Sequence, residues 1–244
     1  MRAVILAAGV GNRIGAAHEG PKALLRFGGR SLLERHLDIL ARACIDEIVI
    51  GTGYREGDIA TELSRLGKLH VRLVHNPDYR QGSVVTLWSL REAVTAGGDV
   101  IVMDADVLYD RRMIERLVAS RHRNVLLMDR GFVPGEEPVK ICLAEGRIVE
   151  FRKKVEVAHD TVGESVGFFR FDATGARALI EAARVYVEGG RGAAPHEEAI
   201  RDLLRAAAPG VFGVEDVTGL PWLEIDFPED LARAEREVLP RLVE

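Results

Sequence analysis

The sequence predicts an α/β fold in which a mostly parallel mixed sheet is flanked by helices. Up to about residue 125, short apolar runs of strand length alternate with amphipathic stretches of helix length. Strands and helices that alternate in this way form parallel sheets with helices on both faces. Beyond residue 125 several short strand patterns follow one another, with a hairpin turn at Glu145-Gly146. We therefore expect a β-rich elaboration in the second half.

The first half supplies the alternating elements. The expected helix at residues 31–43 carries Leu33, Leu37 and Leu40 on one stripe, with Ser31 as its N-cap. Further helices are expected at residues 57–65 and 83–96. The expected strands are the apolar runs at residues 3–7, 47–51, 71–75 and 100–103.

The second half begins with strand patterns and ends with helices. Strands are expected at residues 124–128, 139–143, 148–153 and 166–171, and near residues 222–225. The helical patterns lie at residues 173–188, 196–208 and 229–242, and Pro228 suits the first turn of the last helix. A glycine-rich stretch, residues 189–192, separates two of the helices and is expected to be a mobile loop.

The first strand ends in a glycine-rich loop followed by two cations. Residues 4–15 read V-I-L-A-A-G-V-G-N-R-I-G, and Pro21-Lys22 follows. Glycines let the backbone approach a ligand closely, and amides in such turns bind anions. Arg13 and Lys22 supply the full charges that a polyphosphate needs. The spacing matches neither the dinucleotide fingerprint nor the P-loop, and the alternative is a turn with incidental basic residues.

Two pairs of acidic residues are each spaced i, i+2. Asp104 and Asp106 close the fourth expected strand, and Glu224 and Asp226 lie near the last one. Residues spaced by two on a strand share a face, and Mg²⁺ binds one or two protein carboxylates while keeping several waters. The alternatives are solvated turn carboxylates and, for Asp226, the N-cap of the last helix.

The glycine loop and the closing segment W-x-E-I-D-x-P-E-D-L, residues 222–231, resemble the MobA-like and sugar-phosphate nucleotidyltransferases. The phosphocholine and inositol-phosphate cytidylyltransferase branch is the most similar. The resemblance implies a Rossmann-like (GT-A-like) single domain, with a nucleotide-binding half at residues 1–125 and an acceptor-binding, metal-closing half at residues 126–244. It further implies that Asp106 and Asp226 hold a catalytic Mg²⁺, with Asp104 and Glu224 in supporting positions.

The same resemblance assigns the contacts with the nucleoside triphosphate. Arg13 and Lys22 are the expected catalytic residues. Residues 76–83, N-P-D-Y-R-Q-G-S, are similar to the segment that passes under the base, although Ser83 could instead cap the following helix. The expected nucleotide-binding residues are Leu6, Ala7, Ala8, Gly9, Gly11, Asn12, Arg13, Lys22, Asn76, Gly82, Ser83 and Asp104.

For the acceptor, residues 139–167 resemble the "VK…G…K…GE-x-x-G" segment of this branch. Lys140 and Lys153 would contact the acceptor phosphate, and Glu164 and Glu197 would bind the rest of the acceptor. A lone Lys is more often a solvated strand residue, and Lys154 could take the place of Lys153.

A quaternary ammonium needs an aromatic box, but aromatic residues make up only 6% of the chain. Phe132, Tyr186 and Trp222 are the candidate walls. The polar side chains of Glu164, Arg191, His196, Glu197 and Glu198 suit hydroxyl groups or a primary amine, although residues 196–198 could equally be a charged first helical turn. Inositol phosphate and aminoethylphosphonate are therefore favoured over phosphocholine.

Taken together, the sequence predicts a Mg²⁺-dependent cytidylyltransferase. It would transfer CMP from CTP to a small phosphorylated alcohol or phosphonate and release pyrophosphate. One alternative is a nucleotidyltransferase that uses GTP, UTP or dTTP with a sugar 1-phosphate or the molybdenum cofactor. Another is a nucleotide-binding module without catalytic activity.

Composition limits the partners. The formal net charge is −5, which does not favour a nucleic-acid partner. The sequence shows neither a membrane-span-length apolar run nor a secretory leader. Cys44 and Cys142 lack metal-site spacing, and we expect reduced, buried thiols in a cytoplasmic protein. A homodimer is compatible with these observations.

Overall fold

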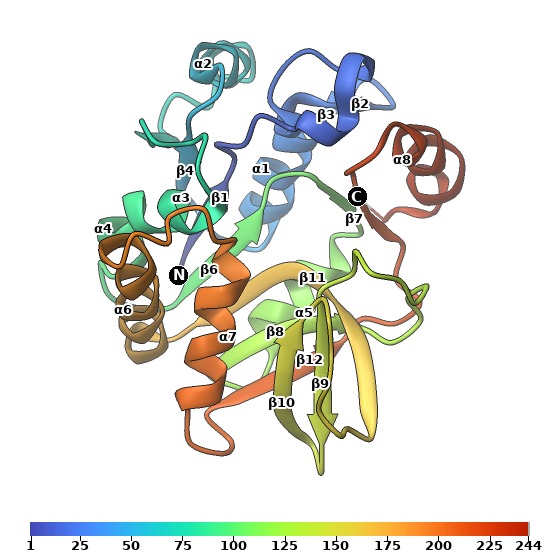
Figure 1. The fold of residues 1–244 in the computed structure, drawn as a ribbon. Coiled ribbons are helices and arrows are strands. Elements are labelled where there is room, and N and C mark those ends of the chain that lie inside the picture. The colour runs from blue at the N-terminus through green and yellow to red at the C-terminus, as the bar shows by residue number, and fades with distance from the viewer. Residues whose placement is uncertain (244) are drawn as a thin grey trace.

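The computed structural model describes residues 1–243, and of residues 12, 16 and 17 it describes the backbone alone. Within this part of the chain, nine strands form one central sheet. Seven of them follow the order β10-β9-β11-β6-β1-β4-β5, while β8 pairs with β11 and with β12. Helices cover both faces of the sheet (Figure 1). The expected α/β fold with a mixed sheet is confirmed.

Four parallel strands form the first half of the sheet. β1 (Arg2–Leu6) lies between β4 (Glu47–Thr52) and β6 (Val100–Asp104), and β5 (Arg72–His75) pairs with β4. Leu6 is in register with both Gly51 and Asp104. The carboxyl ends of β1 and β6 are therefore level, and the segments that follow them share one edge of the sheet.

The second half of the sheet is largely antiparallel. The long strand β11 (Thr161–Phe171) pairs antiparallel with β6, β8 (Asn124–Asp129) and β9 (Lys140–Ala144). β10 (Arg147–Arg152) follows β9 through Glu145 and Gly146, whose φ angles of 51° and 73° form the expected tight turn. β12 (Phe212–Asp216) pairs parallel with β8.

The side chains of β1 alternate between two hydrophobic cores, one on each face of the sheet. Ala3 and Ile5 pack on the face covered by α1 (Leu32–Arg42), α2 (Glu56–Arg65) and α5 (Arg112–Ala119). Val4 and Leu6 pack on the opposite face. That face is covered by α3 (Ser83–Ser89), α4 (Arg91–Val94), α6 (Ala173–Glu188) and α7 (His196–Ala206).

A third core holds the C-terminal segment near the glycine loop. β13 (Trp222–Glu224) pairs with β7 (Val107–Tyr109), just after β6. Ile225 and Val238 pack with Ile14 and with Phe27 of the β2 (Arg26–Phe27) and β3 (Arg30–Ser31) hairpin. The last helical segments are α8 (Pro228–Arg233), the π-turn η3 (Ala234–Val238) and the 3₁₀ turn η4 (Leu239–Arg241). This packing brings residues 224–226 beside residues 104–106.

Several local predictions need correction. The expected helix at residues 83–96 is divided at Leu90 into α3 and α4. The last helix changes from α to π and then to 3₁₀ geometry, and its final turn, which ends at Arg241, contains Pro240, which lacks an N–H group. The strands β7 and β12 and the helix α5 were not expected. Cys142 is buried, but the prediction that Cys44 is buried is wrong, because it lies exposed in a left-handed turn after α1 with φ 58°.

No helix among residues 1–243 is both long and apolar enough to cross a bilayer.

Candidate nucleotide and acceptor site

The carboxyl ends of β1 and β6 open into a cavity of about 470 Å³, which we call the first pocket. The glycine loop and the two acidic pairs meet here, where ligands bind in parallel α/β sheets. The segment before α3 and the start of α7 complete the wall. The residues that line it are Leu6, Ala7, Ala8, Gly9, Val10, Gly11, Arg13, Lys22, Ala23, Tyr79, Arg80, Gln81, Gly82, Ser83, Thr86, Asp104, Ala105, Asp106, His196, Glu197, Glu224 and Asp226.

The glycine loop has the backbone geometry of an anion cradle. Gly11 has φ 70°, and a Cβ atom there would lie 3.1 Å from Cγ of Lys22. Within the described part of the chain, the amides of residues 8–11 donate to no backbone carbonyl. These donors therefore remain for a ligand. The side chain of Asn12, which was expected to bind nucleotide, lies outside the described residues.

Lys22 lies between two carboxylates from distant parts of the chain. Its Nζ donates to Oδ2 of Asp106 at 3.0 Å and to Oδ1 of Asp226 at 2.6 Å. Burial alone would lower the pKa of Lys22, but the two carboxylates outweigh that effect, so the pKa is raised. The ammonium group is therefore charged and held in place at the entrance to the glycine loop.

Three carboxylates are arranged as a group that could bind a metal ion. Oxygens of Asp106, Glu224 and Asp226 all lie within 4.8 Å of one another. The Lys22 ammonium group already lies against two of them, which shows that this place attracts a cation. Carboxylate oxygens are hard ligands that suit Mg²⁺. The donor set therefore fits a divalent cation, and it includes Glu224, which was expected only in a supporting position.

Asp226 is available for this role because another residue caps α8. The N-cap of α8 is Phe227, and the Asp230 carboxylate accepts the amides of Asp226 at 3.0 Å and of Phe227 at 2.8 Å. The alternative that Asp226 is itself the N-cap is therefore wrong. Its carboxylate points instead to Lys22 and Arg13.

Asp104 lies beside this group of carboxylates. Burial, the neighbouring carboxylate of Glu197 and that of Asp106 raise its pKa well above the usual value. A Cβ atom on Gly167 of β11 would lie 2.3 Å from Asp104 Oδ2. Gly167 thus leaves room for the Asp104 carboxylate at the end of β6.

Of the residues expected near the nucleotide base, some line the first pocket and one does not. Gly82 and Ser83 line the first pocket, and a Cβ atom on Gly82 would lie 2.0 Å from the carbonyl oxygen of Ala194. Asn76 is fully buried behind the pocket, where its amide donates to Thr86 Oγ1. The structure therefore does not bring Asn76 to the pocket wall, although Asn76 holds Thr86, which does line it.

A second pocket of about 380 Å³ adjoins the first, and Arg13, Asp104, Glu197, Glu224 and Asp226 line both. Its other walls come from β8, β11, the segment before β9 and the C-terminal segment. They are Asp129, Gly131, Phe132, Val133, Glu137, Pro138, Val139, Lys153, Glu164, Ser165, Gly167, Phe169, Trp222, Leu223, Phe227, Asp230 and Arg233.

Arg13 connects the two pockets. Its guanidinium donates to Oδ1 of Asp226 at 2.9 Å and to Glu137 at 3.0 Å. It also lies over the Phe227 ring, 5.4 Å from the centroid. This cation is therefore close to both the carboxylate group and the entrance of the second pocket.

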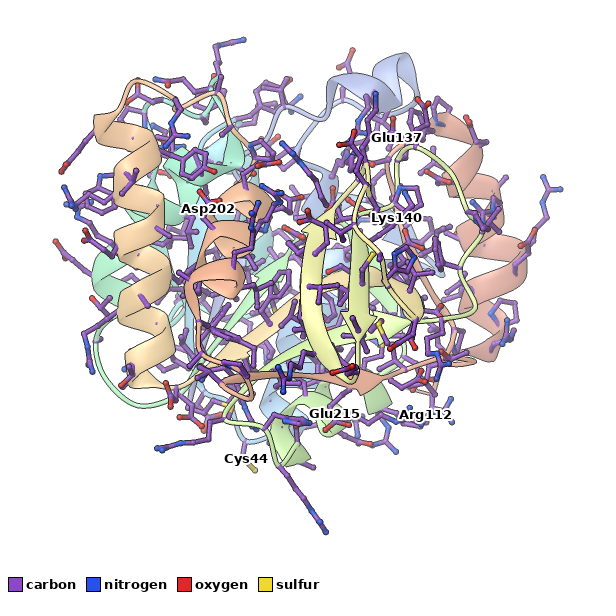
Figure 2. The ribbon with its side chains drawn as sticks, turned by 60° about the horizontal axis from the view of Figure 1, so that its bottom comes forward. Cys44, Arg112, Glu137, Lys140, Asp202 and Glu215 are labelled. Carbon is purple, nitrogen blue, oxygen red and sulfur yellow. The ribbon has the colours of Figure 1, made fainter. Side chains whose placement is uncertain are left out.

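The two lysines expected to bind the acceptor lie in different environments. Lys153 lines the second pocket and pairs with Glu137 at 2.9 Å. The Lys140 ammonium group donates to the carbonyls of Gly135 and Lys153, both at 2.7 Å, and to that of Pro138 at 3.3 Å. Figure 2 shows Glu137 and Lys140 at the same end of the β9–β10 hairpin. The structure thus brings Lys153, and not Lys140, to the pocket wall.

Two further carboxylates lie side by side in the second pocket. Glu164 is in register with Asp129 of β8. Burial and the Asp129 carboxylate raise the pKa of Glu164 to about 7. Asp129 accepts Trp222 Nε1–H at 2.8 Å. Asp129 was missed in the sequence, although it ends a buried strand just as Asp104 does.

The second pocket is more aromatic than the composition indicated. Phe132 and Trp222 line it as candidate walls, together with Phe169 and Phe227. Tyr186 does not line it, because its hydroxyl binds Asp202 at 2.8 Å between α6 and α7.

Comparison with known proteins places this site in a family. The model of the MobA-like NTP transferase domain matches residues 3–152. The chain belongs to the MobA-like NTP transferase family. The chain is 31% identical over 97% of its length to a "bifunctional IPC transferase and DIPP synthase" of Rubrobacter xylanophilus, and it covers 52% of that protein. It spans about half the length of the first curated relatives that it matches.

Two further similarities extend over nearly the whole chain. It is 26% identical over 98% of its length to a "CMP-5'-(3-aminopropyl)phosphonate synthase" of Streptomyces rubellomurinus, of which it covers 39%. The structure of CTP:phosphocholine cytidylyltransferase from Streptococcus pneumoniae superposes with a TM-score of 0.72. That match has 21% identity and covers 96% of this chain and 97% of the other, which supports the fold.

Proposed function

We propose that this nucleotidyltransferase is a Mg²⁺-dependent cytidylyltransferase that transfers CMP from CTP to a small phosphorylated alcohol or phosphonate. The observation that carries the proposal is Lys22, held between Asp106 and Asp226 where the two pockets meet. A triphosphate in the first pocket and an anionic acceptor in the second would meet at this point. The name of the relative from Streptomyces supports transfer of CMP to a phosphonate acceptor.

The chemistry requires positioning and charge neutralisation more than a protein base. A phosphate monoester has its second pKa near ~6, so the acceptor oxygen is already largely ionised at neutral pH. In-line attack of that oxygen on the α-phosphorus forms the new P–O bond and breaks the bond to pyrophosphate. Loop amides and Arg13 would hold the departing pyrophosphate, and Lys22 would stabilise charge at the α-phosphate.

Asp106 and Asp226, with Glu224, would hold the divalent cation. When bound, Mg²⁺ would supply positive charge that neutralises phosphate oxygens and orients them. Lys22 would then move from the carboxylates towards the nucleotide. In the ligand-free arrangement, the ammonium group neutralises the carboxylates that the cation would otherwise bind.

In the second pocket, Lys153 and Arg13 would receive the acceptor phosphate, and Glu164 and Glu197 would contact the rest of the acceptor. We further propose that residues 1–244 act as one domain, with residues 1–125 binding the nucleotide and residues 126–244 the acceptor. Glu224 and Asp226 line the first pocket from the second half, which supports one domain whose two halves form the site together.

The decisive measurement is pyrophosphate release with Mg²⁺ and CTP against inositol 1-phosphate, aminoethylphosphonate, phosphoethanolamine, phosphocholine and glucose 1-phosphate. Turnover with CTP and one of the first four acceptors is the expected result. Turnover only with GTP, UTP or dTTP, or only with glucose 1-phosphate, would contradict the proposal, as would triphosphate binding without turnover.

The metal assignment has its own test. Chelation with EDTA should abolish turnover, and added Mg²⁺ should restore it. The variant Asp226→Asn should lose at least about a hundredfold in kcat because a ligand and a Lys22 partner are removed together. Asp216→Asn, at an exposed residue on β12, is the matched control and should retain wild-type activity. Full activity of Asp226→Asn, or EDTA-resistant turnover, would refute the metal site.

A further inference from the structure

His196 begins α7 and is clamped to the segment before α3. Its backbone N–H donates to Oγ of Ser83 at 2.8 Å, and its Nδ1 lies 3.0 Å from the same oxygen. Ser83 Oγ thus contacts both the backbone and the ring of His196. Ser83 therefore acts as a clamp for His196, and the alternative that Ser83 caps α3 is wrong, since the N-cap is Gly82 and shows no side-chain cap bond.

The other ring nitrogen has no protein partner. Only 2% of His196 is exposed, and Nε2 makes no hydrogen bond among the described residues. The nearest acidic oxygen is Oδ1 of Asp104, 3.7 Å away, which is too far for a direct hydrogen bond. The Glu197 carboxylate faces Nδ1, on the other side of the ring, at 3.1 Å. An unpaired buried polar atom is costly, which indicates that a ligand group completes this site.

The position of His196 Nε2 and the groups around it narrow the choice of ligand group. His196 and Asp104 both line the first pocket, where His196 contacts Ser83 of the segment Tyr79–Ser83 and Asp104 is in register with Leu6, which precedes the glycine loop. A hydroxyl group can donate one hydrogen bond and accept another at the same time, so it can bridge His196 Nε2 and the Asp104 carboxyl group. Between the phosphates and the base of a nucleotide, the hydroxyl groups are those of the ribose.

We propose that His196 Nε2 and the Asp104 carboxylate together bind a ribose hydroxyl of the nucleoside triphosphate, so that His196 selects ribonucleotides over deoxyribonucleotides. The proposal rests on the proposed function, because it requires a nucleotide in the first pocket. It makes His196, which comes from the acceptor half of the chain, a determinant of donor specificity.

The experiment compares CTP with 2′-deoxy-CTP and 3′-deoxy-CTP. The ratio of kcat/KM for CTP to that for each analogue is measured for the wild type, His196→Phe, His196→Gln and His70→Asn. Phe keeps the ring shape without nitrogens, while Gln keeps an N–H donor. His70 is exposed near the start of β5, away from both pockets, and is the matched control. Because both substrates are measured on one preparation, the ratio is independent of the folded fraction.

We expect the wild type to discriminate against at least one analogue by about tenfold or more, the cost of an unpaired buried polar group. His196→Phe should lose most of that discrimination, His196→Gln should keep part of it, and His70→Asn should keep all of it. Equal ratios in the wild type and His196→Phe, or no discrimination by the wild type, would overturn the proposal.

Calorimetric titration of the same triphosphates gives the discrimination without turnover. A chain that binds CTP in preference to a deoxy analogue through His196, but releases no pyrophosphate, would refute the proposed reaction and uphold the ribose assignment. A chain that turns over CTP, but whose ratio of kcat/KM for CTP to that for each analogue does not change when His196 is substituted, would uphold the proposed reaction and refute the ribose assignment.

Discussion

The first and second pockets share residues but are built in different ways. The first lies at level carboxyl ends of parallel strands, and its central cation, Lys22, has a side chain only 11% exposed. The second lies at the rim of antiparallel strands, where the ion pair of Lys153 and Glu137 is about half exposed on both sides. A buried charge held by two partners has one position, whereas an exposed pair is weakly held and easily exchanged. This difference is why we propose nucleotidyl transfer in the first pocket and acceptor recognition in the second.

This contrast also explains how one site can serve two substrates. Arg13 lines both pockets, so its guanidinium would neutralise charge on both the donor and the acceptor. Changes in the first pocket should therefore affect turnover itself, while changes confined to the second should affect mainly the acceptor.

The largest effect is expected for Lys22→Ala. It removes the charge proposed to act at the α-phosphate and leaves Asp106 and Asp226 without their partner. We expect kcat to fall about 10² to 10³-fold, as for loss of a donor that stabilises transition-state charge. Lys68→Ala is the matched control, since Lys68 makes one ion pair of 3.7 Å, with Asp38, away from both pockets. A fall in kcat of less than about tenfold, or ~1.4 kcal/mol of barrier, would contradict this role for Lys22.

Much of the first pocket could be predicted because its signals are local in the sequence. An apolar strand, glycines and two cations occur within residues 4–22, and Asp104 and Asp106 end the next recognisable strand of the pocket. Parallel pairing then brings the strand ends level, as the register of Leu6 with Asp104 shows. The short strand β7 was not predicted, although its partner β13 was, because the three residues of β7 form a strand through this pairing.

The rest of the site depends on contacts between distant segments. Ser83 and His196 are 113 residues apart, and Asp129 and Trp222 are 93 apart. Periodic patterns in the sequence do not predict contacts between residues so far apart. Lys140 illustrates the same limit, because its three carbonyl partners are arranged by the path of the hairpin and the segment before it. Sequence reasoning identified the residue types of the second pocket but could not tell which lysine faces it.

A smaller effect should separate those two lysines. Lys153→Ala should raise the KM for the acceptor about threefold to tenfold and leave the KM for CTP unchanged, since it removes an exposed charge near the acceptor phosphate. Lys140→Ala should leave both KM values near those of the wild type and lower the melting temperature, because three carbonyls lose their donor. The measurement is a pair of substrate titrations with thermal melts. An equal rise in acceptor KM for both variants would show that Lys140 also reaches the acceptor.

The smallest expected effect concerns the pKa of Glu164 in the second pocket. Burial and the Asp129 carboxylate raise the pKa of Glu164 to about 7, from an ordinary value of 4.5. The folded chain therefore binds this proton more tightly than the unfolded chain. The resulting contribution to stability is fully present below pH 4.5 and is lost as the pH rises through 7.

Glu164→Gln removes the ionisation, so it should melt a few degrees above the wild type at pH 8, at ~2–4 °C per kcal/mol for a chain of this size. The difference should shrink at pH 5, where the wild-type carboxyl group is protonated in the folded state. Glu92→Gln, at an exposed residue of α4, is the matched control and should show no such pH-dependent difference. If Glu164→Gln melts with the wild type at both pH values, the pKa of Glu164 is ordinary and Asp129 does not oppose its charge. The second pocket would then hold two ionised carboxylates at no cost in stability, and the two pockets would differ less in how they hold charge.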